Sequence, residues 1–175
     1  EARIEAVDTK LNALPTLCTG RARDAARNLT PTGRDGAGAR GWLAGLPIAV
    51  KDLSNVAGVR TTFGSPIFAN HVPEASDITV EILERNGALV IAKSNTPEFG
   101  AGANTFNPVF GATLNPWNLD LTCGGSSGGA AVAVATGQVW LATGSDLGGS
   151  LRTPASFCSV VGLRPSPGRV ARTTA

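Results

Sequence analysis

Serines embedded in glycine clusters are the residues of this 175-residue chain best suited to covalent chemistry. One cluster, at residues 123–129, reads Cys-Gly-Gly-Ser-Ser-Gly-Gly, and a second, at 144–150, reads Gly-Ser-Asp-Leu-Gly-Gly-Ser. Glycine lets the backbone approach a ligand closely, and free N–H groups beside a serine can stabilise an oxyanion. A flexible linker is the alternative interpretation. The apolar run 130–135 argues against it, because a linker stays polar on both sides.

Three serines of these clusters, Ser126, Ser127 and Ser150, are candidate nucleophiles, and each would need a base to remove its proton. Residues 124–128 match the G-x-S-x-G elbow of serine hydrolases, but those enzymes place a histidine after the serine. His71 is the only histidine, precedes all three serines and lies in a polar turn typical of the surface. A serine–histidine triad therefore cannot be completed within this sequence.

Flanking residues exclude other uses of the glycines and cysteines. A phosphate-binding loop needs Gly-Lys-Ser/Thr, whereas Gly129 is followed by Ala130. Residues 36–41 satisfy G-x-G-x-x-G, but no strand precedes them, so we do not expect a dinucleotide site. The three cysteines are widely spaced and form no C-x-x-C, which predicts neither a zinc site nor a disulfide framework. Free thiols in a reducing cytoplasm are the expectation.

Lysine is the remaining general base, as in the serine–lysine variants of the catalytic triad. Burial can lower a lysine pKa toward about 7–8, where the neutral amine can accept a proton. Lys51 lies in the apolar run 48–53, which predicts a buried strand, and it suits this role better than any other lysine. Taken alone, Lys51 is more simply explained as an edge-strand residue at solvent. Asp52 is its neighbour, but adjacent strand residues point to opposite faces; Lys93 is the other lysine near a possible site.

Alternating strand and helix patterns must position these residues. An apolar strand at 48–53, a helix at 76–87 capped by Ser76, and an apolar strand at 88–92 fit one βαβ unit. Such a unit predicts an α/β fold with a parallel-type sheet covered by helices. Further helices are expected at 2–14, 20–29 and 128–135, and two more should begin at residues 97 and 150. Further strands are expected at 138–142 and 160–163, a loop at 30–41 and a tight turn at 145–150.

The composition fits a globular domain without a polyanionic partner. Fifteen basic and 13 acidic residues give a net charge of +2, which is too balanced to predict binding to nucleic acid or to an anionic membrane. The longest apolar run, 130–142, is interrupted by polar residues and is shorter than the ~20 residues that span a bilayer. Because the sequence lacks methionine and ends without an obvious terminal element, we expect a piece of a longer chain.

Four segments resemble the amidase signature family, and they are long, ordered and consistently spaced. The segments are 45–52 (GLPIAVKD), 124–129 (GGSSGG), 144–155 (GSDLGGSLRTPA) and 157–165 (FCSVVGLRP), and the resemblance runs from about Leu43 to Val170. It implies a mixed β-sheet sandwiched between layers of helices, in a chain much longer than this one. Residues 1–175 would then be the N-terminal portion of one amidase-type domain, with a helical lead-in at 1–42 and the signature core at 43–175.

The same resemblance implies a role for individual residues. Ser150 would be the acyl-forming nucleophile, Ser126 the bridging serine after a cis peptide, and Lys51 the base of the proton relay. The backbone N–H groups implied to face the oxyanion are those of Leu147, Gly148, Gly149 and Ser150, and the implied supporting residues are Ser127, Asp146, Gly124 and Gly125. The resemblance implies a small-molecule amide substrate and no metal or other cofactor; a homodimer is expected only by analogy.

Three functions remain open at this point. The first is hydrolysis of a carboxylic amide to an acid plus ammonia or an amine. The second is that of the glutaminase-type A subunit of a tRNA-dependent amidotransferase, and the third is a non-catalytic binding member or inactive fragment. Five residues differ from the pattern common in the family or from the pattern typical of the amidotransferase A subunit. Together they favour the free-standing amidase, and they are Leu147, Thr153, Ser159, Ser166 and Pro167.

Overall fold

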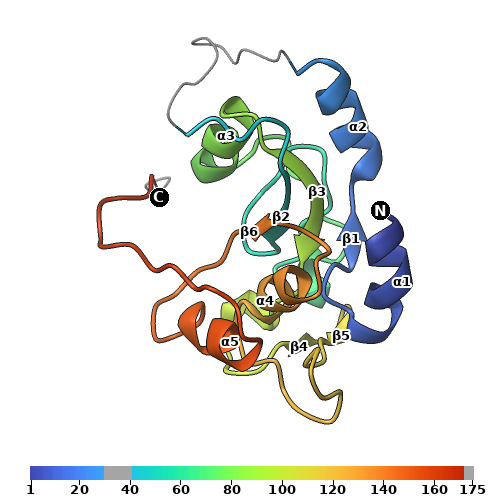
Figure 1. Cartoon of the computed structure of the whole chain (residues 1–175), viewed down its shortest axis with the longest axis vertical. Coiled ribbons are helices and arrows are strands. Elements are labelled where there is room, and N and C mark those ends of the chain that lie inside the picture. The colour runs from blue at the N-terminus through green and yellow to red at the C-terminus, as the bar shows by residue number, and fades with distance from the viewer. Residues whose placement is uncertain (30–40, 172–175) are drawn as a thin grey trace.

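The computed structural model describes residues 1–29 and 41–171, and these residues form a mixed α/β fold around one central sheet. The strands lie in the order β1 (Thr16–Leu17), β3 (Leu89–Ser94), β2 (Pro47–Lys51) and β6 (Leu141–Ala142). β2 is parallel to both β3 and β6, whereas β1 pairs antiparallel with β3 (Figure 1). The expected βαβ unit and the mixed sheet with helices are therefore confirmed.

The two faces of the sheet are covered by different helices. Ile48 and Val50 of β2 pack in one apolar cluster with Val80 of α3 (Ile78–Arg85). Ala49, between them in sequence, packs in a second cluster with Val132 of α4 (Gly128–Ala135). Successive strand side chains alternate between the faces, so Lys51, two residues after Ala49, is directed toward α4.

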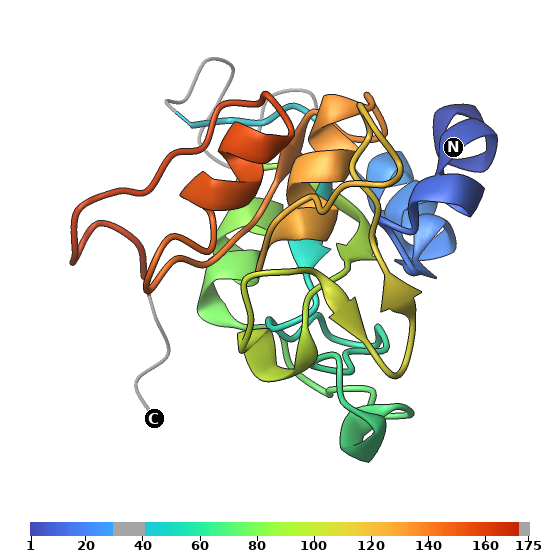
Figure 2. The ribbon, with the colours of Figure 1, turned by 90° about the horizontal axis from the view of Figure 1, so that it is seen from below.

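The remaining elements surround this core. α1 (Ala2–Leu11), β1 and α2 (Thr19–Arg27) form the N-terminal part, and a short hairpin joins β4 (Phe106–Asn107) to β5 (Gly111–Ala112). Single 3-10 turns occur at Pro66–Phe68 and Glu98–Gly100, and α5 (Arg152–Phe157) packs beside α4 (Figure 2). Among the described residues, no helix has the length and apolar character needed to cross a membrane.

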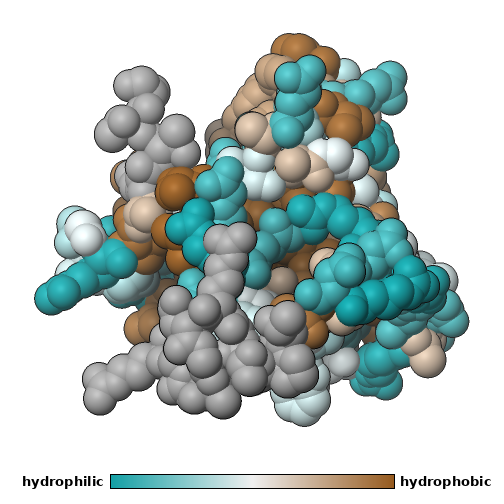
Figure 3. Space-filling model, turned by 90° about the horizontal axis from the view of Figure 1, so that it is seen from above, coloured by the Kyte–Doolittle hydropathy of each residue, from teal (hydrophilic) through white to brown (hydrophobic). Residues whose placement is uncertain are grey.

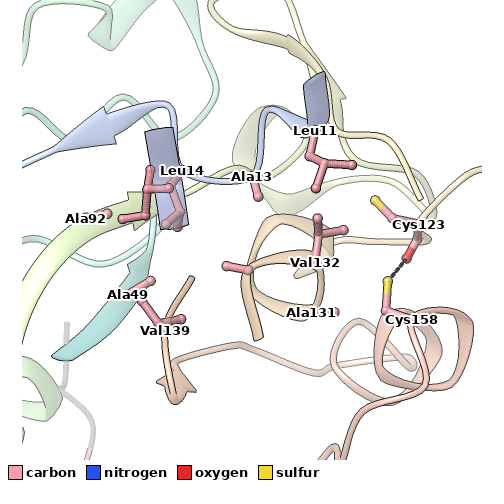
Figure 4. Close-up of a cluster of buried hydrophobic side chains, with 12 residues drawn as sticks. Leu11, Ala13, Leu14, Ala49, Ala92, Cys123, Ala131, Val132, Val139 and Cys158 are labelled. Carbon is pink, nitrogen blue, oxygen red and sulfur yellow. Dashed lines mark hydrogen bonds between the residues drawn. The ribbon is translucent and has the colours of Figure 1, made fainter. Parts of the chain in front are cut away.

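One of the two apolar clusters ties the ends of the described chain together. Leu11 at the end of α1 lies near Val132 of α4, and Leu14, three residues later, lies beside Ala92 of β3 (Figure 4). On the other side of α4, the Cys158 thiol donates to the carbonyl oxygen of Cys123 at 3.7 Å. Burial raises the pKa of Cys123 to about 11 and that of Cys158 to about 12, so both remain protonated. These thiols and Cys18 are free, as expected.

The structure corrects several predicted elements. The first helix ends at Leu11 rather than residue 14, because Asn12 adopts the left-handed conformation. The helix predicted from 76 begins at Ile78 after Asp77, since the Ser76 hydroxyl instead accepts the N–H of Ala57. The helix predicted from 97 is only a 3-10 turn, and residues 160–163 form no strand. The predicted loop 30–41, with the G-x-G-x-x-G pattern, lies outside the described residues except for Gly41.

Candidate active site

Lys51 is the last residue of β2 and its side chain is buried, with 2% of its surface exposed. Its backbone N–H donates to Thr143 Oγ1 at 3.0 Å, which fixes the strand end against the segment that follows β6. Burial lowers the pKa of Lys51 from 10.5 to about 7, and the carboxylate of Asp146 opposes this shift. The explanation of Lys51 as a solvent-exposed lysine is therefore wrong, and a neutral amine is accessible near neutral pH.

Three serine hydroxyls, those of Ser126, Ser127 and Ser145, surround the amine of Lys51, and we call them the Lys51 hydroxyl cluster. Nζ lies 2.7 Å from Ser126 Oγ, 2.9 Å from Ser127 Oγ and 2.9 Å from Ser145 Oγ. The sequence pointed to Ser126 and Ser127 but not to Ser145. The one available signal was the position of Ser145 in the second glycine cluster, beside Asp146.

The first cluster brings Ser126 to Lys51 through tightly packed glycines. The Gly125–Ser126 peptide is cis, as the resemblance implied. A Cβ on Gly125 would lie 3.0 Å from the backbone of Ala103 and Asn104, and one on Gly124 would lie 3.2 Å from Pro154 Cα. Gly124 also has a φ of 77°, in the left-handed region that favours glycine. Both glycines therefore let the backbone beside Ser126 pack against neighbouring main chain.

The second cluster folds around the carboxylate of Asp146. This carboxylate accepts the N–H of Gly149 at 2.8 Å, that of Leu151 at 3.3 Å and that of Arg152 at 3.2 Å. The Arg152 guanidinium donates to it as well, at 2.9 Å, and holds the pKa of Asp146 well below its usual range. Asp146 is thus ionised at any pH relevant to activity and organises the turn that carries Ser150.

Ser150 is joined to the first cluster through its main chain. Its carbonyl oxygen accepts the N–H of Ser127 at 2.9 Å, so the two glycine clusters lie against each other. The Ser150 side chain is half-buried, and its hydroxyl has no hydrogen-bond partner among the described residues. The structure therefore brings Ser150 beside the Lys51 hydroxyl cluster without a direct Ser150–Ser126 hydrogen bond.

One implied oxyanion donor is already engaged. The N–H of Gly149 donates to Asp146 Oδ1, so it does not face an open site as the resemblance implied. Within the described part of the chain, the N–H groups of Leu147, Gly148 and Ser150 donate to no protein acceptor. Leu147 and Gly148 are also exposed, which leaves their N–H groups accessible to a ligand.

Asp52 and Lys93 belong to the opposite face of the sheet. Lys93 Nζ lies 3.0 Å from Asp52 Oδ1 in a fully buried ion pair, and it also donates to Ser54 O at 2.8 Å and Thr61 Oγ1 at 2.6 Å. Asp52 is therefore not a partner of Lys51, in agreement with strand alternation. His71 is half-buried and packs against the rings of Phe63 and Phe68.

Comparison with known proteins gives consistent matches over nearly the whole chain. A family model described as Amidase matches residues 1–174. The glutamyl-tRNA(Gln) amidotransferase A subunit of Bacillus velezensis is 49% identical over 170 residues, covering 97% of this chain and 35% of its own length. Its counterpart in Anaeromyxobacter dehalogenans is 46% identical over 171 residues, covering 98% of this chain and 35% of its own length.

Solved structures give a similar match. The crystal structure of a bacterial aryl acylamidase of the amidase signature family superposes with a TM-score of 0.88 at 34% sequence identity. The superposition covers 99% of this chain and 36% of the acylamidase. The chain thus spans about 35% of the length of the curated relatives that it matches.

Proposed function

Because this chain belongs to the amidase family, we propose that it contributes the catalytic serines and lysine of an enzyme that hydrolyses a carboxylic amide. The observation that carries this proposal is the buried Lys51 amine, with a pKa of about 7, placed 2.7 Å from Ser126 Oγ. A neutral buried amine is a competent base, and a serine hydroxyl is its natural proton donor.

The proposed relay runs from Ser150 through Ser126 to Lys51. As Ser150 Oγ attacks the amide carbonyl, its proton passes to Ser126 Oγ and the Ser126 proton passes to Lys51 Nζ. The step requires a Ser150–Ser126 hydrogen bond, and such bonds often tighten only when substrate is bound. When the C–N bond breaks, the leaving amine takes a proton back along the same path. Water then hydrolyses the acyl-enzyme by the reverse sequence of proton transfers.

The tetrahedral intermediate carries a negative charge that needs fixed donors. The free N–H groups of Leu147, Gly148 and Ser150 suit this role, since preorganised backbone donors stabilise an oxyanion without reorganising. Asp146 supports them indirectly by holding the turn through the N–H of Gly149. Ser127 supports the relay by accepting from Lys51.

A second candidate function is that of an amidotransferase A subunit, which differs from the first in the amide that it cleaves. The two curated relatives described above are components of glutamyl-tRNA(Gln) amidotransferases, at 46% and 49% identity. The sequence identity to these relatives favours glutamine as the amide, with the ammonia delivered to a charged tRNA. Leu147 and Thr153 favour a free-standing amidase. The two candidates share the acyl-enzyme step and differ in the fate of ammonia, which is released in one case and delivered in the other.

Covalent labelling of the full-length polypeptide tests the shared step. We expect a fluorophosphonate to add once to the wild type, not to add to Ser150→Ala, and to add at least about 100-fold more slowly to Lys51→Ala. Intact-mass spectrometry measures each adduct. The wild-type labelling rate should rise as the pH passes through about 7, because deprotonated Lys51 is the base.

The control is Ser156→Ala, an exposed serine of α5 whose hydroxyl binds none of the described residues. It should label like the wild type. An adduct that survives Ser150→Ala, or a wild type that does not label at all, would overturn the nucleophile assignment and favour a non-catalytic binding protein.

A further inference from the structure

Ser145 is the residue of the Lys51 hydroxyl cluster that has no assigned role. It lies 94 positions after Lys51, yet its Oγ is 2.9 Å from Lys51 Nζ. The hydrogen-bonding capacity of the other two serines restricts what Ser145 can do, because each hydroxyl has one hydrogen to donate. The following account rests on the proposed function, in which neutral Lys51 must accept a proton from Ser126.

Ser127 can act only as an acceptor toward Lys51. Its hydroxyl donates to the carbonyl oxygen of Ser145 at 3.3 Å and accepts the backbone N–H of Ser145 at 3.2 Å. With its one hydrogen used, Ser127 Oγ must receive an N–H from Lys51 at 2.9 Å. Neutral Lys51 then has one N–H and one lone pair left to share between Ser126 and Ser145.

Burial decides between the two possible arrangements. Ser126 is 2% exposed. Within the described residues, its hydroxyl forms a hydrogen bond with Lys51 Nζ alone. Leaving that buried hydroxyl hydrogen undonated is costly, so it is directed to the Lys51 lone pair. Ser145 is an exposed residue whose hydrogen can be donated to water instead, which frees its oxygen to accept from Lys51.

We propose that Ser145 is a positioning residue, which accepts an N–H of Lys51 and so directs the lysine lone pair at Ser126. The charged groups around Lys51 are consistent with this role. Asp146 is the carboxylate that acts on it, and α4 carries no charged side chain. Asp52, directly after β2, is paired with Lys93 on β3 at the other face. The hydroxyl cluster, rather than a second charge, therefore orients the amine.

The Ser145→Ala variant of the full-length polypeptide tests the proposal. Without this acceptor the amine is free to rotate its N–H toward Ser126, so the fluorophosphonate labelling rate should fall about 10- to 100-fold. The acceptor also stabilises the protonated amine, so its removal should shift the apparent pKa of the labelling rate downward by about 0.5–1 unit. Ser145→Thr retains the hydroxyl and should restore both the rate and the pKa.

Control variants separate the possible failures. Ser156→Ala should match the wild type in rate and apparent pKa, and circular dichroism should show that every variant is folded. A normal rate in Ser145→Ala, or a reduced rate with an unshifted pKa that Ser145→Thr does not restore, would overturn the role of Ser145. Labelling that persists in Ser150→Ala would overturn the proposed function itself, whatever Ser145→Ala does.

Discussion

Burying Lys51 reduces the stability of the fold while it prepares the residue for proton transfer. The ammonium form loses its hydration when the side chain is enclosed, and the pKa falls from 10.5 to about 7 as a result. Three hydroxyl partners replace part of that hydration. Activity and stability are therefore linked through one titration.

This linkage predicts a pH-dependent difference between the wild type and Lys51→Met. Between pH 7 and 10.5 the unfolded wild type binds more protons than the folded form, so its free energy of unfolding rises with pH. The slope due to Lys51 should reach about 1.4 kcal/mol per pH unit. Below pH 7 both states are protonated and the difference from Lys51→Met should be constant.

Urea denaturation of both proteins at pH 6, 8 and 10 measures this difference. Other groups, including Lys93, contribute equally to both proteins and cancel in the subtraction. Parallel stability profiles for the two proteins would show that the Lys51 pKa is not lowered by folding.

At the scale of elements, close packing of α4 decides whether the serine cluster reaches Lys51. Gly129 lies in the first turn of α4, where an added Cβ would lie 2.6 Å from Ala13 O and 2.8 Å from Asn95 O. These are main-chain atoms, so the neighbours cannot move aside without shifting β3 or the segment after α1. The helix therefore approaches the sheet only because this position has no side chain.

Gly129→Ala should destabilise the protein by about 3 kcal/mol, the upper range for overpacking a rigid core. Gly20→Ala is the matched control, because Gly20 is also helical and has open space around its Cβ position. That change should be neutral or stabilise by up to about 1 kcal/mol through helix propensity. Thermal denaturation compares the two, and equal effects would contradict the packing argument.

At the scale of the whole molecule, apolar side chains are exposed on several segments. Trp140 is 81% exposed and Val161 is 97% exposed. On the face shown in Figure 3, hydrophobic residues reach the surface between hydrophilic ones. Contiguous apolar surface of a few hundred Å² promotes association with other proteins or copies. The described residues thus carry apolar surface that is available for further contacts.

The 175-residue chain by itself should bind a hydrophobic dye and self-associate. Replacing Trp140 and Val161 by Gln and Ser should lower both signals without loss of helical circular dichroism. Glu74→Gln, at another exposed position, should change neither. Dye fluorescence and sedimentation velocity provide the measurements, and an unaffected double variant would locate the association elsewhere.

Features that depend on local chemistry and periodicity could be predicted from the sequence alone. Glycine clusters marked the turns around Ser126 and Ser150, and the small apolar residues of 128–135 predicted α4 with the bounds that the structure has. The apolar run around Lys51 predicted the buried strand. Secondary structure and residue type are sufficient here because each signal lies within a few consecutive positions.

Contacts between groups that are distant in the sequence became visible only in the folded chain. The register of β2 against β3 shifts between Ile48 and Ala49, and alternation beyond that point directs Lys51 toward the serines and Asp52 toward Lys93. Likewise, the contact of Ser145 with Lys51 and the engagement of the Gly149 N–H by Asp146 follow from how the turn 144–150 folds onto α4. Hydrogen bonds join particular atoms at particular distances, and no local pattern in the sequence specifies them.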